Sequence, residues 1–329
     1  MSRLKPLKSF VHGLLTGAAG LTLAGIGADQ AQAQAYGPRI FLPAPSGTNA
    51  VNFQIINIDS NTSFDASIVY PDLNIDTDAF VFSYVRNFEL GGTSGQVVIT
   101  QPIAIVDIGV TAGNLGISRG NTGLADTQVE LRVGILGAPA ADIPEYVQYL
   151  TEENPDVVIK GLVGVTFPTG DYSTSQIVNI GSNRFAFRVG LPTTINLGPN
   201  WAPGNRTLLE VIPAANFYTS NNSPPFPNSQ FGSDFNSQNP LFTLETHFSH
   251  DLGPRFFASI DGYFVTGGAT SSNGVGNNNA QSWLGAGGVP SVVPCGRGGT
   301  LTVSYGGVVA RNENSPDGAQ IKLFLLQAF

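Results

Sequence analysis

The chain has 329 residues and a formal net charge of −8, and its charged share of 12% is about half that of a typical soluble domain. An acidic chain with so few cations is a poor nucleic-acid binder, so no nucleic-acid partner is expected. The single cysteine, Cys295, excludes an intramolecular disulfide and a cysteine-based metal site.

The N-terminus has the layout of an export signal. A short basic region comes before an apolar run at 10–26, and two small-x-small sites follow that run. The pattern predicts a Sec-type signal peptide over 1–33, cleaved after Ala33 or Ala35. An uncleaved anchor is the alternative, but the run is short of the roughly 20 residues of a membrane span. No later apolar run could span as a helix, so 34–329 would cross a membrane only as strands.

The remaining chain shows alternating polarity in about twelve segments, which is typical of transmembrane strands. The best example is 241–250, where Phe242, Leu244 and Phe248 lie on one face and Glu245 and His247 on the other. The fold class predicted is an all-β, antiparallel outer-membrane β-barrel. A secreted β-sandwich is the alternative, because its strands alternate in the same way. The segments are, approximately, 51–58, 78–89, 96–109, 126–136, 156–167, 185–197, 206–218, 240–250, 255–266, 281–292, 300–311 and 319–329.

The connections and the C-terminus support the barrel. If both termini are periplasmic, the polar stretches 219–239 and 267–281 are outer loops, and the tight turn 251–254 lies inside. The inner connection 137–155 is long, and 141–153 has helical spacing. The chain ends on Phe329 in a strand with one apolar face, which predicts pairing within the barrel wall and recognition by the barrel-assembly machinery. Aromatic girdles are expected at both membrane faces; their members are Trp201, Phe256 and Phe329 at the inner face and Phe217, Tyr218 and Phe264 at the outer face.

The inward faces of these strands carry charges of both signs. Mixed signs favour internal ion pairs that fill a narrow lumen, and polar contacts along a solute path are the alternative. These lumen-lining candidates are Glu130, Arg132, Lys160, Arg188, Glu210, Glu245, His247, Asp261 and Lys322.

No catalytic constellation is expected. His247 and His250 lie near the inner end of their strand, and Ser249 between them points to the opposite face from its neighbour His250. The sequence has no phosphate loop, calcium loop or cysteine cluster, so no cofactor and no metal site are predicted.

The central region resembles a known family. Two stretches, Val165–Tyr172 and Asn179–Phe185, are similar to the bacterial family named for the MetA-type meta pathway of phenol degradation. Their most specific positions are Asn179, Gly181, Asn183 and Arg184. Weaker similarities extend over about 75–329, with Phe185 where the family usually has Trp. The resemblance implies an outer-membrane transporter of apolar aromatic compounds. Asn183 and Arg184 are expected to close loop 168–184 onto the strand top, with contact to a solute as the alternative.

Together these features predict an exported, non-enzymatic barrel in the outer membrane, surrounded by lipid and lipopolysaccharide. Its predicted function is passive, porin-like uptake of small, hydrophobic or aromatic solutes. The alternative is a closed structural or surface-interaction barrel whose outer loops carry the function.

Overall fold

A computed structural model of the chain describes residues 36–65, 67–70, 73–112, 115–176, 178–226, 233–290, 292–295 and 299–329. The expected signal peptide and both cleavage positions, after Ala33 and Ala35, lie outside the described residues. Within the described ranges, no helix is long and apolar enough to cross a membrane.

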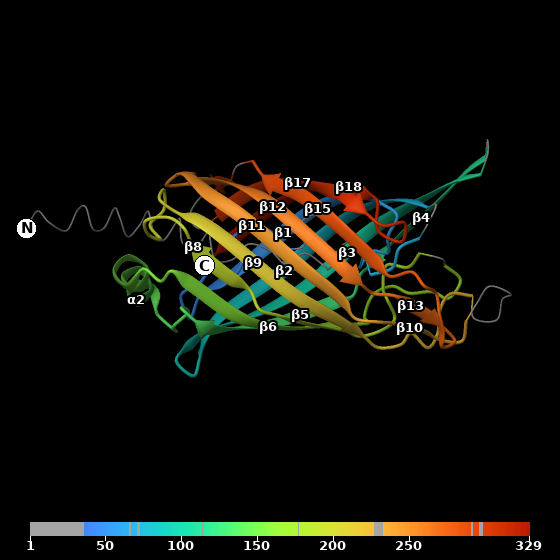
Figure 1. Cartoon of the computed structure of the whole chain (residues 1–329), viewed down its shortest axis with the longest axis horizontal. Coiled ribbons are helices and arrows are strands. Elements are labelled where there is room, and N and C mark those ends of the chain that lie inside the picture. Colours follow the sequence, from blue (N-terminus) through green and yellow to red (C-terminus); the bar gives the residue numbers. More distant parts are fainter. Residues whose placement is uncertain are drawn as a thin grey trace, which may run out of the picture.

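The described chain is built almost entirely of antiparallel strands that surround one lumen (Figure 1). The strands are β1 (Asn49–Ser60), β2 (Asn74–Leu90), β3 (Thr93–Ala112), β4 (Leu115–Leu124), β5 (Thr127–Leu136), β6 (Val157–Phe167), β7 (Ala186–Gly190), β8 (Thr193–Asn196), β9 (Thr207–Tyr218), β10 (Asn236–Gln238), β11 (Leu241–Gly253), β12 (Phe256–Gly267), β13 (Thr270–Ser272), β14 (Val275–Gly276), β15 (Gln281–Val289), β16 (Val292–Cys295), β17 (Gly299–Arg311) and β18 (Gly318–Ala328). Two short helical segments, α2 (Ile143–Gln148) and η1 (Tyr149–Glu153), connect β5 to β6.

The sheet closes on itself as a twelve-stranded barrel, which confirms the predicted fold class. β18 pairs with β1, and β9 pairs with β11, so neither end of the sheet is left as an edge. β7 and β8 are two parts of one barrel strand that is interrupted at Leu191 and Pro192, because proline has no N–H to donate. The backbones of Asn49 and Phe329 exchange two hydrogen bonds of 3.0 Å, so the last residue is held in the wall.

The strands are apolar on the outside and polar on the inside. On the outside, Phe82 is 53% exposed and Ile260 is 74% exposed, whereas the inward neighbours Ser83 and Asp261 are almost fully buried. A soluble β-sandwich buries its apolar face instead, so this inversion excludes the sandwich and fits a wall that faces lipid.

The two ends of the barrel differ. The C-terminus, β8 and α2 lie at one end, which we call the inner end, and β10, β13 and β4 lie towards the other, outer end (Figure 1). The predicted helix in 137–155 is confirmed as α2 and η1, and Asp142 begins it with a capping box that includes Glu145. The helix covers the inner end, because Tyr146 and Leu150 are buried against Leu42 and Leu208 from the barrel interior.

Two of the expected girdle residues have a different position. Trp201 is only 2% exposed, and its indole N–H donates a 2.7 Å hydrogen bond to the carbonyl of Pro155, so it packs beneath the inner helix instead of facing lipid. Tyr218 stacks under Arg184, whose guanidinium lies 4.3 Å from the ring centre. Phe217, Phe256, Phe264 and Phe329 do face outward.

Candidate functional site

The lumen is occupied by the stretch that comes before β1, residues 36–46, which we call the lumen segment. Its last residue lies at the inner end, where the Ser46 amide donates a 2.8 Å hydrogen bond to the Ala141 carbonyl. Its side chains are buried, including Ile40, Phe41 and Leu42 at 2% exposure or less. Residues 36–46 therefore close the barrel from within.

On one side, the lumen segment is held through its backbone and through one arginine. Glu245 accepts hydrogen bonds from the amides of Tyr36 (3.0 Å) and Gly37 (3.2 Å), and Glu210 accepts one from the Arg39 amide (2.6 Å). The Arg39 guanidinium pairs with Asp251 at 2.5 Å and lies 3.9 Å from the centre of the Phe257 ring. Acidic side chains on β9 and β11 thus bind one side of the segment.

Basic side chains on β5, β6 and β7 bind its other side. Lys160 Nζ donates a 2.9 Å hydrogen bond to the Leu42 carbonyl, and the Arg132 guanidinium lies 4.5 Å from the centre of the Phe41 ring. Arg188 lies over the Tyr36 ring at 4.8 Å, and the Tyr36 hydroxyl donates to Glu130 at 2.8 Å. The segment therefore lies between an acidic and a basic part of the wall.

All nine lumen-lining candidates are buried, and the structure brings most of them together around the lumen segment. His247 lies between two carboxylates, with Nε2 3.0 Å from Glu245 and Nδ1 2.7 Å from Asp261. Arg132 and Glu130 form an ion pair of 2.8 Å on β5. Lys322 is buried on the opposite part of the wall, on β18. Their role along a solute path stays a prediction.

Beside the charged residues, the inside of the wall also carries a belt of apolar side chains. Members of this apolar belt come from β6, β9, β11, β12 and β15 and pack against Ile40 and Phe41 of the lumen segment. The interior of a transmembrane barrel is usually polar, so an apolar belt in the lumen is a distinctive surface. Its members are Leu162, Ile212, Leu241, Tyr263, Val265 and Trp283.

The outer end is closed by a second non-strand segment, residues 61–65 and 67–70, which we call the mouth loop. Its Ser67 is 2% exposed and is held from three sides: the Ser67 carbonyl accepts hydrogen bonds from Gln238 (2.7 Å) and Gln281 (3.0 Å), and its hydroxyl accepts one from Arg184 (2.8 Å). Arg184 also donates to Gln238 at 2.6 Å. Arg184 therefore fixes the mouth loop over the lumen and does more than close its own loop.

The residues that carry the family resemblance form one cluster at the outer end. The Asp126 carboxylate accepts hydrogen bonds from the amides of Gly170 and Ser182, both 2.8 Å, and from the Ser182 hydroxyl at 2.6 Å. Burial raises the pKa of Asp126, and these hydrogen bonds oppose that rise. The backbones of Gly170 and Gly181 are in contact, so a side chain at either position would collide with the backbone of the other.

Two asparagines of the motif organise the neighbouring loops. Asn179 accepts a 2.7 Å hydrogen bond from the Ser173 amide and donates to the carbonyls of Ser173 and Gln176. Asn183 takes a positive φ of 54° and donates to Asn221 of the next outer loop at 2.8 Å. The motif is therefore a scaffold that joins the outer loops.

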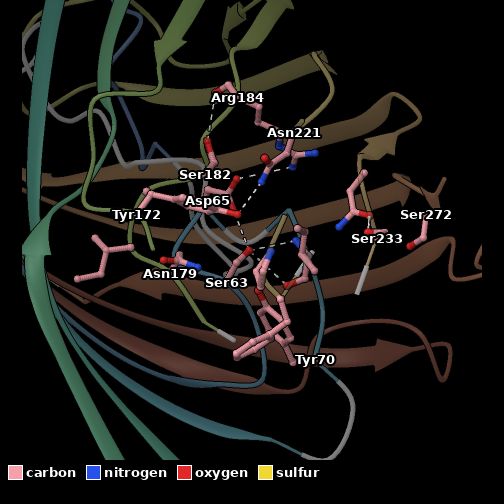
Figure 2. Close-up of a pocket in the computed structure, with 16 residues that line it drawn as sticks. Ser63, Asp65, Tyr70, Tyr172, Asn179, Ser182, Arg184, Asn221, Ser233 and Ser272 are labelled. Carbon is pink, nitrogen blue, oxygen red and sulfur yellow. Dashed lines mark hydrogen bonds and ion pairs between the residues drawn. The ribbon is translucent and has the colours of Figure 1, made fainter. Parts of the chain in front are cut away.

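These loops enclose an outer pocket of about 310 Å³. The mouth loop contributes Ser63 and Asp65, the motif region contributes Tyr172 and Arg184, and β13 contributes Ser272. Figure 2 shows Tyr172 and Asn179 on one side of the pocket and Ser233 and Ser272 on the other, with Asp65 and Ser63 between them. Within the described part of the chain, no group of three or more histidine, cysteine or acidic residues could hold a metal ion.

Sequence reasoning found the charged inward residues but missed both closing segments. The available signal was Arg39 followed by Ile40, Phe41 and Leu42 between prolines, in a stretch too short to add another barrel strand. Such a mixture of one cation and bulky apolar residues fits a buried segment, but nothing local identifies the lumen as its partner.

Comparison with known proteins gives a consistent result. A family model described as "Putative MetA-pathway of phenol degradation" matches residues 57–295. Among solved structures, the COG4313 outer membrane channel from Pseudomonas putida F1 superimposes with a TM-score of 0.67 at 15% identity, covering 87% of this chain and 97% of that chain. The β domain of the Bordetella autotransporter BrkA gives a TM-score of 0.47 at 9% identity, covering 86% of this chain and 100% of that chain. No curated protein gives a significant match.

The fold is therefore that of a bacterial outer-membrane β-barrel, and the predicted location in the outer membrane is confirmed.

Proposed function

This chain belongs to the putative MetA-pathway of phenol degradation family, and from that premise we propose that it is an outer-membrane channel for passive uptake of small hydrophobic or aromatic solutes. Lipopolysaccharide slows the diffusion of apolar compounds, so a protein-lined route would speed their passage. The channel acts by diffusion, without a catalytic step or a cofactor.

The apolar belt in the lumen is the observation that carries the proposal. Leu162, Ile212 and Val265 point inward on three different strands, whereas the inward face of a porin for hydrophilic solutes is mainly polar. In the closed state, Ile40 and Phe41 of the lumen segment cover this belt. Withdrawal of the segment would leave an apolar surface on which a small aromatic solute gains the free energy of burial.

The way in which the barrel is closed also favours a channel. Both closing elements, the lumen segment and the mouth loop, are irregular stretches outside the strands of the wall. They are held by discrete hydrogen bonds and ion pairs, so each can be displaced without breaking the ladder of the barrel. Opening by displacement of these two stretches is part of the proposal.

The alternative is a permanently closed barrel that serves as a structural or surface-interaction protein. The dense burial of the lumen segment is the observation in its favour, because Arg39, Ile40 and Phe41 leave almost no exposed surface. The two functions differ in one measurable property, the rate at which apolar solutes cross the outer membrane.

The test is the initial uptake of labelled toluene by cells that lack the gene and by the same cells with the gene restored. We expect slower uptake in the deletion strain and recovery with the intact chain, while uptake of glycerol, a hydrophilic control, is unchanged. Equal toluene uptake in both strains, with the protein present in the outer membrane, would overturn the proposal in favour of the closed barrel.

A further inference from the structure

The outer pocket lies directly on the mouth loop, outside the closed lumen. Ser63, Asp65, Ile68 and Tyr70 of that loop form one part of its lining (Figure 2). Residues after β6 and β9, which are the segments joined by the family motif, form the rest together with Ser272 of β13. A solute that approaches from outside therefore meets this pocket before it reaches the lumen.

The walls of the pocket are built for a small ring compound. Tyr172 and Phe226 present aromatic rings, and Ile180 and Pro225 add apolar surface. The segments of Tyr172 and Phe226 are tied together, because the Phe226 amide donates a 2.7 Å hydrogen bond to the Thr174 carbonyl. A volume of about 310 Å³ is at the small end of the roughly 300–1,000 Å³ typical of small-molecule sites, so a single ring with few substituents fits.

Most polar groups around the pocket are held by one another, so the pocket is formed before any ligand binds. The Tyr172 hydroxyl donates to the Ser223 carbonyl at 2.8 Å and accepts from Asn221 at 2.9 Å. Ser233 donates to Asn236 at 2.5 Å. A site with preset side chains costs little conformational entropy when it binds a ligand.

Asp65 is the polar group that can still accept a hydrogen bond from a ligand. Its side chain is 28% exposed, and it accepts three hydrogen bonds, from the Ser63 hydroxyl (2.5 Å) and from the hydroxyl and amide of Ser67 (2.7 and 3.2 Å). Arg184 lies 3.9 Å away, which is beyond hydrogen-bond distance. A carboxylate has about four acceptor positions, so one remains for a donor in the pocket.

We propose that this outer pocket is a capture site for a single-ring aromatic solute that carries a hydroxyl group. The ring packs against Tyr172 and Phe226, and the hydroxyl donates to Asp65. The inference rests on the proposed function, because it names the place where a solute is first held before passage. Since Asp65 belongs to the mouth loop, the captured molecule contacts the segment that must move for the lumen to open.

The experiment is a calorimetric titration of phenol into the purified full chain in detergent, with matched pocket and control variants. Ser272→Phe places a ring in the pocket, whereas Ser271→Phe changes the adjacent residue of β13, whose side chain lies on the opposite face of the strand. We expect saturable phenol binding that Ser272→Phe weakens by about tenfold or more and Ser271→Phe changes by less than about twofold. Asp65→Asn should weaken the binding of phenol more than that of toluene, which has no hydroxyl.

Two outcomes overturn the capture site: equal phenol affinity in the Ser272→Phe and Ser271→Phe variants, or no saturable binding to the unmodified chain. Failure of the capture site and failure of the channel are distinguishable. If toluene uptake depends on the gene but the two variants bind phenol with equal affinity, only the proposal of the capture site is rejected. If only Ser272→Phe loses affinity for phenol and toluene uptake does not depend on the gene, the capture site is supported and the proposal of a channel is rejected.

Discussion

Replacement of Arg39 by alanine is expected to open the lumen. The Arg39 guanidinium is almost fully buried, pairs with Asp251 at 2.5 Å, donates to Ser249 at 2.8 Å and stacks on Phe257. The alanine variant keeps the backbone amide that donates to Glu210, so only the side-chain contacts of the lumen segment are lost.

The cost of the substitution depends on which interactions Asp251 keeps when the Arg39 side chain is removed. Asp251 still pairs with Arg206 at 2.8 Å and still accepts from the amide of Gly204, so its charge is not left without a partner. The loss is therefore that of a charged hydrogen-bonded contact, about 2–3 kcal/mol, and not the larger cost of an orphaned buried charge. If the state in which the lumen segment has left the lumen lacks these contacts, the population of that state relative to the closed state rises by roughly 30–150-fold in the variant.

Single-channel recording in planar bilayers measures this population as the open probability. Arg311→Ala is the control, because Arg311 also pairs with an aspartate, Asp317 at 2.7 Å, but lies exposed at the outer end of β17, away from the lumen segment. We expect a clear rise in open probability for Arg39→Ala and none for Arg311→Ala. An unchanged open probability in a correctly folded Arg39→Ala variant would refute the idea that residues 36–46 gate the channel.

Four further predictions follow from the same structure. Deletion of Phe329 removes a residue that pairs with Asn49, so the yield of folded protein in the outer membrane should fall. Heat-modifiable mobility on gels measures this yield, and a normal yield would contradict assembly through Phe329. Gly181→Ala should destabilise the motif cluster by about 1–3 kcal/mol, because the new methyl group would meet the backbone of Gly170. Gly276→Ala is the control, because a methyl group there would enter open space. Limited proteolysis should cut the outer loops faster in Gly181→Ala than in Gly276→Ala. Val265→Thr places a hydroxyl in the apolar belt and should slow toluene uptake several-fold without slowing glycerol; equal effects on both solutes would argue against a selective belt. Burial raises the pKa of Tyr146 above its ordinary value of 10.0, so its contribution to stability is fully present below about pH 10 and is lost as the pH rises further. Tyr146→Phe should therefore reduce the fall in unfolding temperature at alkaline pH. An unchanged fall would show that another group causes it.

The barrel strands could be predicted because their signal is local. Alternation with a period of two, as in Phe242 and Leu244 against Thr243 and Glu245, identifies both the strand and its lipid face. The inner helix was predictable for the same reason, since Tyr146 and Leu150 are four residues apart on one helical face.

The candidate site depends on contacts between residues far apart in the chain, which no local pattern encodes. Glu245 was predicted to face the lumen, but its partner is the backbone of Tyr36, 209 positions earlier. Arg184 was predicted to close its own loop, yet its partners include Ser67 of the mouth loop. Trp201 was misplaced because an aromatic residue near a strand end fits a lipid girdle and a packed inner cap equally well.

The most direct test of the central claim is toluene flux through the purified chain in asymmetric bilayers with lipopolysaccharide in one leaflet, where metabolism and other channels play no part. We expect faster flux with the intact chain than with the lipid alone, and a further increase with Arg39→Ala. Flux equal to that of the protein-free bilayer for both proteins would contradict the claim and identify the chain as a closed barrel.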